Sequence, residues 1–262
     1  MKLPNLFKTK APHAGGMPRI LILTPVKDAF DCLDGYVKRL RGLTYPHHLI
    51  SLGFLEGDSA DGTFVELERM APALRREFAE VTLRKKDFGY RLPPSVGRKS
   101  DDVQAARRAV LAKSRNHLLF HALAEEEWVL WIDVDVIEYP PDIIERLLAT
   151  GKQIVNAHCV LDYGGGTYDL NAWRDHGRLV LNDFRGSDTP VELDTVGGTM
   201  LLIHADLHRD GLIFPSFPYG EGNSKIRNGH GELETEGLGI MAADMGQTCW
   251  GLPDLEVLHG RW

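Results

Sequence analysis

The stretch Trp128-Val-Leu-Trp-Ile-Asp-Val-Asp-Val136 decides the fold that we predict for this chain. Its short apolar run, rich in β-branched and aromatic side chains, is typical of a buried strand at the centre of a sheet. Residues two apart on a strand share one face, so we expect Asp133 and Asp135 to point the same way. Burying two unpaired carboxylates would cost much free energy, and we therefore expect both at the open carboxyl edge of the sheet.

A pair of neighbouring carboxylates is typical of a site for a hard divalent cation such as Mg²⁺ or Mn²⁺. The alternative is that one aspartate begins a turn and the other caps a helix announced by Pro140-Pro141. An Asp-x-Asp tripeptide does not decide between these alternatives, because so short a motif is weak outside its context. The rest of the sequence is therefore needed to choose between a metal site and a turn with a helix cap.

The composition is that of a globular protein, with 43% apolar and 26% charged residues among 262. This length allows one large domain or two small ones. The net charge of −7 argues against a nucleic-acid binder, which is usually basic. The three cysteines are scattered without CxxC spacing, which suits a reducing compartment. No apolar run approaches membrane-spanning length, and we expect residues 1–18 to be a weakly basic, flexible arm and not a secretory signal. We therefore expect a cytoplasmic protein, or one peripheral at the membrane, without a transmembrane segment.

Strand-like and helix-like patterns alternate along the chain. Strands are predicted at residues 19–25, 49–55, 81–83, 128–136, 153–159 and 195–204, and helices at 26–41, 64–78, 101–123, 142–149 and from 234 to about 246. The strand at 195–204 opens with Gly197-Gly198, where the missing side chains let another group approach the backbone. Alternation of this kind predicts βαβ units and a parallel sheet.

Polar loops follow three of the predicted strands. They are Thr24-Pro25-Val26, Glu56-Gly-Asp-Ser-Ala-Asp-Gly-Thr63, and the Asp133–Asp135 pair. Ligands of such α/β proteins bind in the crevice beyond the carboxyl ends of the strands. A cation-binding pair beside an acidic loop suits a nucleoside diphosphate, because the cation bridges the phosphates while a carboxylate accepts from the base or ribose.

Taken in order, the motifs of this chain resemble those of the fungal mannan-polymerase mannosyltransferases, glycosyltransferase family 62, and of small bacterial relatives of that family. The motifs are Arg19-Ile-Leu-Ile-Leu-Thr-Pro25, Leu43-Thr-Tyr-Pro46, Asp58-Ser59, Arg115-Asn116, Trp131-Ile-Asp-Val-Asp135, Tyr168-Asp-Leu-Asn-Ala-Trp173, Val196-Gly-Gly198, Ala205-Asp206, Phe214-Pro215 and Glu234-Thr-Glu-Gly237. The resemblance extends from about Arg19 to His259 and departs from the family pattern at Gly220–Gly231, which leaves the acceptor open.

The resemblance implies an α/β protein of the GT-A glycosyltransferase fold, with a mostly parallel central sheet flanked by helices. It implies one domain over residues 19–262, in which residues 19–135 bind the nucleotide and residues 136–262 bind the acceptor, a glycan or glycolipid. It also implies Mn²⁺ or Mg²⁺ as cofactor and transfer from a nucleotide sugar with retention at the anomeric carbon. GDP-mannose is the favoured donor, and a UDP-sugar remains open.

Individual residues acquire roles through the same resemblance. Asp133 and Asp135 match the metal-binding Asp-x-Asp, and His259 matches a C-terminal histidine that serves as a further metal ligand. Thr24-Pro25 match the loop under the base, and Asp58 matches the acid that binds base or ribose.

Four further residues complete the expected site. Arg115 is expected to contact the diphosphate, because its planar fork suits phosphate oxygens. Gly198 is expected to lie against the donor. Glu236 matches the acidic residue that opens the acceptor-side helix, where it would act as the catalytic acid or base, and Glu234 is close enough to do the same.

Two other functions remain open at this stage. An Asp-x-Asp phosphohydrolase would carry the motif on its first strand, whereas here three predicted strands precede it. A non-catalytic nucleotide-sugar-binding protein would keep the donor site but lose transfer, and the intact Glu234-Thr-Glu-Gly237 argues against that reading.

Overall fold

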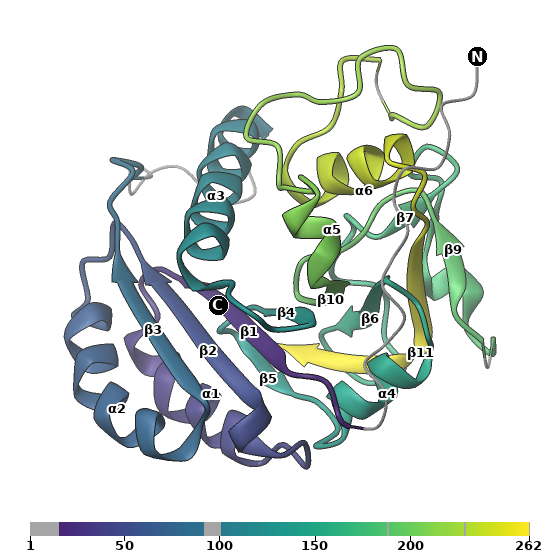
Figure 1. The fold of residues 1–262 in the computed structure, drawn as a ribbon. Helices are drawn as coiled ribbons and strands as arrows, with labels where there is room; N and C mark the ends of the chain where they lie inside the picture. The colour runs from purple at the N-terminus through teal and green to yellow at the C-terminus, as the bar shows by residue number, and fades with distance from the viewer. Residues whose placement is uncertain (1–15, 92–100, 188, 228, 262) are drawn as a thin grey trace.

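The computed structural model describes residues 16–91, 101–187, 189–227 and 229–261. These residues form a nine-stranded sheet in the order β3-β2-β1-β4-β10-β6-β11-β5, with β9 paired to β11 (Figure 1). The strands are β1 Ile20–Val26, β2 Ile50–Glu56, β3 Glu80–Lys85, β4 Trp128–Ile132, β5 Val136–Glu138, β6 Ile154–Val160, β9 Val191–Leu193, β10 Met200–His204 and β11 Cys249–His259. A separate hairpin joins β7 Trp173–Arg174 to β8 Leu179–Val180.

The helices are α1 Phe30–Arg41, α2 Thr63–Glu77, α3 Asp101–Ala122, α4 Ile143–Ala149, α5 Ala205–Arg209 and α6 Glu234–Asp244, with short 3-10 turns at His47–Leu49 and Leu181–Phe184. The predicted βαβ units exist: β1 pairs in parallel with β2 and β4, and β2 pairs in parallel with β3. Strand β10 then runs antiparallel between β4 and β6.

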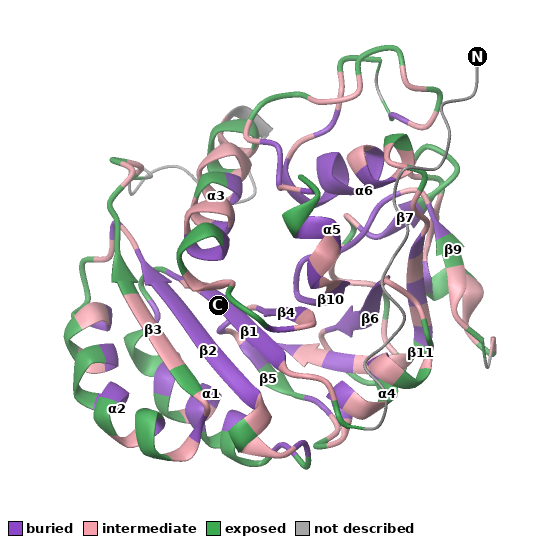
Figure 2. Cartoon of the chain, in the orientation of Figure 1, coloured by how far each residue is buried: buried purple, intermediate pink, exposed green. Residues whose placement is uncertain are grey.

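Two apolar cores lie on opposite faces of the sheet, because successive side chains of a strand point to opposite sides. Ile20 and Ile22 of β1 join the core under α1, α2 and α4, whereas Leu21 and Leu23 join the core under α3, α5 and α6. The central strands are buried along their length (Figure 2). Burial on both faces explains why these strands are continuous apolar runs in the sequence.

The strand predicted over residues 128–136 is interrupted, so that prediction is wrong in detail. Strand β4 ends at Ile132, Asp133 to Asp135 form a turn closed by Val136 N donating to Asp133 O at 3.2 Å, and β5 begins at Val136. The turn releases both aspartates from the sheet, which avoids the cost of burying their charges between strands. Both still lie at the carboxyl end of β4, as the sequence predicted.

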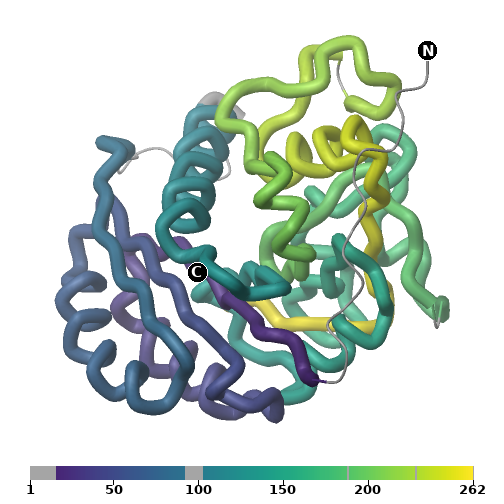
Figure 3. The backbone as a smooth tube through the Cα atoms, viewed as in Figure 1, coloured from purple at the N-terminus to yellow at the C-terminus, as the bar shows by residue number. Residues whose placement is uncertain are grey.

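Other boundaries differ as well. The strand predicted at 195–204 begins only at Met200, and the helix predicted from Val26 begins at Phe30. Helix α5 and strand β11 were not predicted. Strand β11 brings the end of the chain back into the sheet (Figure 3), where it lies between β6 and the edge strand β5 and also pairs with β9.

A single sheet runs from Ile20 to His259, so the predicted nucleotide and acceptor halves share it, and the division after Asp135 stays a prediction. Most of the predicted N-terminal arm, residues 1–15, lies outside the described residues. Within the described part of the chain, every helix is too short or too polar to cross a membrane.

Candidate active site

A cavity of about 550 Å³ opens at the carboxyl ends of β1, β2 and β4. Its volume lies within the range of small-molecule sites in proteins. The lining combines apolar side chains with charged ones of both signs: Pro25, Val26, Lys27, Asp28, Leu55, Gly57, Asp58, Ala60, Phe88, Tyr90, Arg91, Arg107, Val110, Leu111, Ser114, Asp133, Val134, Asp135 and His259. The fold therefore brings the predicted metal ligands and the acidic loop to one cavity.

His259 and Asp135 face each other in this cavity. His259 Nε2 lies 3.2 Å from Asp135 Oδ1, and His259 Nδ1 lies 2.6 Å from the carbonyl oxygen of Gly260. The ring also packs on Tyr168, with centroids 4.4 Å apart. Burial alone would lower the pKa of His259, but the hydrogen bond and charge of Asp135 outweigh it and raise that pKa. Because Nδ1–H donates to a carbonyl, Nε2 is the nitrogen left to take up a proton or a metal.

Asp133 is held from behind by Arg115. Arg115 Nη2 donates to Asp133 Oδ1 at 3.0 Å, and the backbone N–H of Asp133 donates to Thr199 O at 3.1 Å. Burial raises the pKa of Asp133, repulsion from Asp135 and Asp169 adds to the increase, and Arg115 opposes it. A bound cation would relieve this repulsion, because it places positive charge between the two carboxylates.

The side chains at this wall suit a hard cation whose remaining coordination positions are filled by a bound ligand and water. Among the described residues, no three His, Cys, Asp or Glu side chains form a ready-made metal cluster. Mg²⁺ and similar ions commonly use only one or two carboxylates and take substrate phosphates and water for the remaining positions. Asp135 and His259, with Asp133 beside them on the cavity wall, fit that mode of binding.

Arg115 itself does not line the cavity, contrary to the expectation that it contacts the diphosphate. It is 1% exposed, its guanidinium stacks 5.3 Å from the ring centroids of Trp131 and Phe214, and its Nε lies 2.9 Å from Glu234 Oε1. The cationic side chain that α3 presents to the cavity is Arg107.

Gly198 makes room for protein and not for a ligand. A Cβ at this position would lie 2.6 Å from Arg115 Nη2 and 2.9 Å from Thr235 Cγ2. The close approach that the sequence predicted exists, but a buried arginine makes it. Thr24 is likewise fully buried, with its hydroxyl 2.5 Å from Tyr36 Oη, whereas Pro25 does line the cavity.

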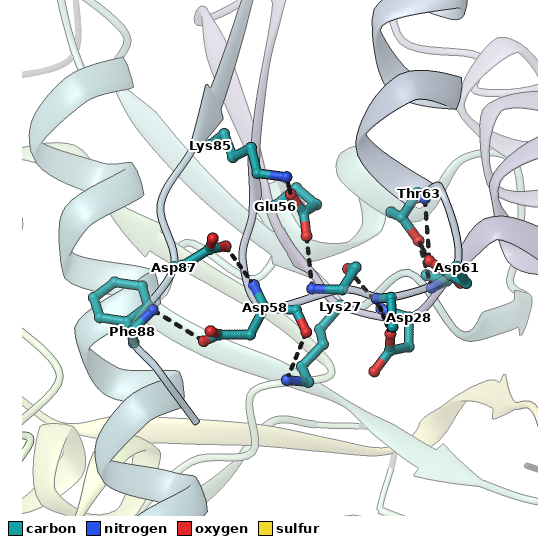
Figure 4. Close-up of polar contacts among 12 residues, drawn as sticks. Lys27, Asp28, Glu56, Asp58, Asp61, Thr63, Lys85, Asp87 and Phe88 are labelled. Atoms are coloured by element: carbon teal, nitrogen blue, oxygen red, sulfur yellow. Dashed lines mark hydrogen bonds and ion pairs between the residues drawn. The ribbon is translucent and has the colours of Figure 1, made fainter. Parts of the chain in front are cut away.

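Asp58 lines the cavity but uses its carboxylate to hold backbone. Oδ2 accepts from the N–H group of Phe88 at 2.9 Å (Figure 4). Oδ2 also accepts from the N–H group of Tyr90 at 3.3 Å, and Oδ1 accepts from that of Gly89 at 2.9 Å. Burial alone would raise the pKa of Asp58, but these backbone donors and Lys27 outweigh it and lower that pKa. The acidic loop therefore fixes the segment at residues 88–90 against the cavity.

Glu236 lies outside the cavity in a buried cluster of charges. Its Oε1 accepts from Trp173 Nε1 at 2.6 Å and lies 3.0 Å from Arg227 Nη2, while Oε2 lies 2.6 Å from Arg108 Nη1. The side chain is 3% exposed, so an acceptor hydroxyl does not reach it in this arrangement.

Glu234 is buried as well. It pairs with Arg115, accepts a hydrogen bond from Thr235 Oγ1 at 2.8 Å, and is absent from the cavity lining. The two glutamates thus lie beside the site and not in it.

The sequence reasoning missed Lys27, Asp28 and Arg107 as cavity residues. Lys27 and Asp28 fell within a predicted helix that begins only at Phe30. The available signal was Asp28 itself, because Asp tolerates left-handed backbone and favours turns over helix interiors. Arg107 lies within the helix predicted over residues 101–123, and no motif in the sequence marks it as a cavity residue.

Comparison with known proteins identifies the family of this chain. The family model described as Anp1 matches residues 1–180 and 178–218. The chain belongs to the Anp1 family. The mannan polymerase complex subunit MNN9 of Candida albicans is 30% identical to this Anp1-family chain over 285 residues, which cover 92% of this chain and 74% of that protein. Mannan polymerase complex subunit mnn9 of Schizosaccharomyces pombe is 31% identical, with coverages of 92% and 79%. The resemblance seen in the motifs is thereby confirmed.

Solved structures share the fold. Mannosyltransferase PcManGT from Pyrobaculum calidifontis, in complex with GDP-Man and Mn²⁺, superposes with a TM-score of 0.56 at 16% identity, covering 95% of this chain and 59% of that one. TarS 1-349 of S. aureus in complex with UDP-GlcNAc also gives 0.56, at 14% identity, over 91% of this chain and 57% of that one. The predicted α/β GT-A fold is confirmed, and the Anp1-family chain spans under two thirds of either solved chain.

Proposed function

We propose that this Anp1-family chain is a metal-dependent glycosyltransferase that uses a nucleotide-sugar donor. The observation that carries the proposal is the Asp135–His259 pair, 3.2 Å apart on the wall of a cavity of about 550 Å³. The relatives named as mannan polymerase subunits and the PcManGT structure with GDP-Man and Mn²⁺ favour GDP-mannose as the donor. A UDP-sugar remains the alternative, and retention at the anomeric carbon is carried over from the family.

Asp135 and His259 would hold Mn²⁺ or Mg²⁺, with Asp133 at the same wall. The cation would neutralise the charge that develops on the departing diphosphate. Arg107 lines the same cavity and would add positive charge near the phosphates. Lys27 instead donates from Nζ to Asp58 O at 3.1 Å and Tyr90 O at 2.7 Å. Pro25, Phe88 and Tyr90 supply flat apolar surface on which a base can pack.

Glu234 and Glu236 receive a positioning role in this proposal. Glu234 holds Arg115, which holds Asp133, and Glu236 ties α6 to Arg108 of α3. Neither carboxylate reaches the cavity, so the proton-transfer role expected from the sequence needs a rearrangement that brings Glu236 out of its pairs.

The test is a thermal-stability panel on the whole chain. GDP-mannose, GDP, UDP-glucose and UDP-N-acetylglucosamine are added with and without Mn²⁺, because a ligand at a hundred times its Kd raises stability by about 2.7 kcal/mol. We expect stabilisation by a guanine nucleotide that depends on Mn²⁺. Release of GDP from GDP-mannose is then measured with mannoside acceptors. No stabilisation by any nucleotide sugar with Mn²⁺ or Mg²⁺ would remove the proposal.

The burial of Glu234 and Glu236 favours a second candidate function. In this alternative the chain is a subunit that binds the donor but does not itself transfer sugar. Glu236 is tied to two arginines and Trp173, and the fungal relatives are named as subunits of complexes. Under this function, metal-dependent donor binding persists while no acceptor and no water accelerates GDP release. Under the leading proposal, a mannoside acceptor accelerates it.

A further inference from the structure

Asp28 occupies a strained position at the edge of the cavity. Its φ is 46°, in the left-handed region that residues other than glycine rarely adopt. Two contacts to the loop after β2 hold it there: the N–H of Asp28 donates to Ser59 Oγ at 2.9 Å, and the N–H of Ala60 donates to Asp28 Oδ1 at 2.9 Å (Figure 4). Non-glycine residues kept in such a conformation by their surroundings are concentrated at functional sites.

The second carboxylate oxygen of Asp28 has nothing to bind within the described residues. Oδ1 serves Ala60, while Oδ2 makes no hydrogen bond and no ion pair in the described part of the chain. The residue is exposed and lines the cavity. Oδ2 of Asp28 is therefore a hydrogen-bond acceptor, held in place at the cavity, that is available to a bound ligand.

Asp58, the acid that the sequence favoured for the nucleoside, shares the left-handed backbone with a φ of 60°, but its carboxylate is already engaged. Its oxygens already accept three backbone N–H groups, and the residue is 7% exposed. Its own N–H donates to Asp87 Oδ1 at 2.8 Å. A carboxylate committed in this way has little capacity left for a ligand.

The order of the strands places Asp28 at the nucleoside end of the cavity. Along the sheet β2 is followed by β1 and then β4, so the turn with Asp133 and Asp135 lies on one side of β1. Asp28 follows β1 and bonds to the loop after β2, on the other side. With the diphosphate at the metal ligands, the nucleoside extends toward Asp28.

We propose that Asp28 is the carboxylate that recognises the nucleoside of the donor, by accepting a hydrogen bond from a base N–H or a ribose hydroxyl at Oδ2. This inference rests on the proposed function. Asp58 then acts as a positioning residue, because it fixes the Phe88–Tyr90 wall against which the base packs.

The test uses Asp28→Asn. Asn keeps an oxygen for the Ala60 N–H and tolerates positive φ, but it presents an NH₂ donor where Oδ2 was an acceptor. Calorimetry with GDP and Mn²⁺ should show an affinity loss of roughly tenfold to a hundredfold, the range for a hydrogen bond to a charged group. Asp28→Gly, which suits the same backbone conformation, provides a second variant if Asn folds poorly. Asp34→Ala, an exposed aspartate of α1, is the matched control and should bind as the wild type does.

Further ligands separate the outcomes. Inorganic pyrophosphate with Mn²⁺ should bind Asp28→Asn and the wild type equally, because it lacks the nucleoside. If the loss seen with GDP disappears with 2′-deoxy-GDP or 3′-deoxy-GDP, the partner is a ribose hydroxyl, and if it persists with both, the partner is the base. Either result supports the inference. The inference would be overturned if both Asp28→Asn and Asp28→Gly bound GDP as tightly as the wild type does. It would also be overturned if Asp28→Asn lost as much affinity for pyrophosphate as for GDP. Absence of nucleotide binding in the wild type would instead remove the proposed function.

Discussion

Arg115 Nη2 lies 3.0 Å from Asp133 Oδ1, in an ion pair whose arginine is 1% exposed. The same guanidinium is 2.9 Å from Glu234, so one buried cation holds two carboxylates on different elements. A buried charge is tolerated only with such partners, because its desolvation costs several kcal/mol. The relationship links the Asp133–Asp135 turn after β4 to the start of α6 through the interior, and it makes Arg115 part of the framework of the site.

Arg115→Met should therefore destabilise the protein by roughly 3–5 kcal/mol, the usual consequence of leaving buried partner charges unpaired. Lys113→Met, at an exposed position of the same helix, is the control and should stay within about 0.5 kcal/mol of the wild type. Urea unfolding followed by circular dichroism measures both. Equal unfolding midpoints in the two variants would contradict the framework role.

Asp135→Ala should abolish the dependence of nucleotide binding on Mn²⁺ while the fold is retained. Asp135 is the carboxylate nearest His259, and its removal leaves a single nitrogen ligand beside Asp133. Calorimetry with GDP at several Mn²⁺ concentrations gives the measurement. The matched control is Asp142→Asn, an exposed aspartate that pairs with Arg146 away from the cavity. A wild-type response to Mn²⁺ in Asp135→Ala would place the cation elsewhere.

Asp58→Asn should loosen the segment at residues 88–90, because one amide oxygen cannot serve the three N–H groups that the carboxylate now accepts. Chymotrypsin cleaves after Phe and Tyr, so cutting at Phe88 and Tyr90 should accelerate. GDP and GDP-mannose should weaken alike, since the wall contacts the nucleoside. Wild-type cleavage rates in Asp58→Asn, compared with Asp34→Asn as a control, would show that the segment is held by other contacts.

Glu236→Gln should lower the free energy of unfolding by roughly 3 kcal/mol, because Arg108 loses its charged partner in a buried environment. This value lies at the low end of the usual range of about 3–5 kcal/mol for breaking a buried ion pair. The reason is that Arg227, the second partner of Glu236, is 37% exposed, so water can solvate its charge. Glu221→Gln, in the exposed loop before α6, provides the control. An unchanged stability combined with a transfer rate lower by on the order of a hundredfold would instead restore the acid–base role expected from the sequence.

His208 should give the protein an acid-sensitive stability. Burial lowers its pKa to about 4, although the hydrogen bond to Leu212 opposes the shift. Between about pH 6.5 and that value the unfolded chain binds a proton that the folded chain refuses, so stability falls as pH decreases through this window. The slope contributed by one such group approaches 1.4 kcal/mol per pH unit. His208→Asn places an amide NH₂ where Nδ1 donates to Leu212 O and does not titrate, so its unfolding free energy should fall less steeply with decreasing pH than that of the wild type. Parallel slopes would exclude His208 as the source.

The sequence alone determined the order of most elements and the place of the Asp133–Asp135 pair. Apolar runs and helical periodicity are local properties, and they located β1, β2, β4, β6 and the main helices to within a few residues. The Asp133–Asp135 pair was placed at a strand end because an unpaired carboxylate cannot be buried cheaply. The family motifs added His259, which lies beside Asp135.

Only the tertiary structure decided which polar groups remain available to a ligand. The sequence predicted that four residues contact a ligand: Asp58, Arg115, Gly198 and Glu236. In the structure each of them contacts protein groups from distant parts of the chain instead. A polar side chain forms its hydrogen bonds with whichever groups the fold brings within about 3 Å. These distances depend on the tertiary structure, so the sequence pattern does not predict them. Asp28 shows the converse. The sequence predicted an ordinary helix residue at this position, whereas the fold holds its backbone against the loop after β2 and leaves Oδ2 without a partner among the described residues.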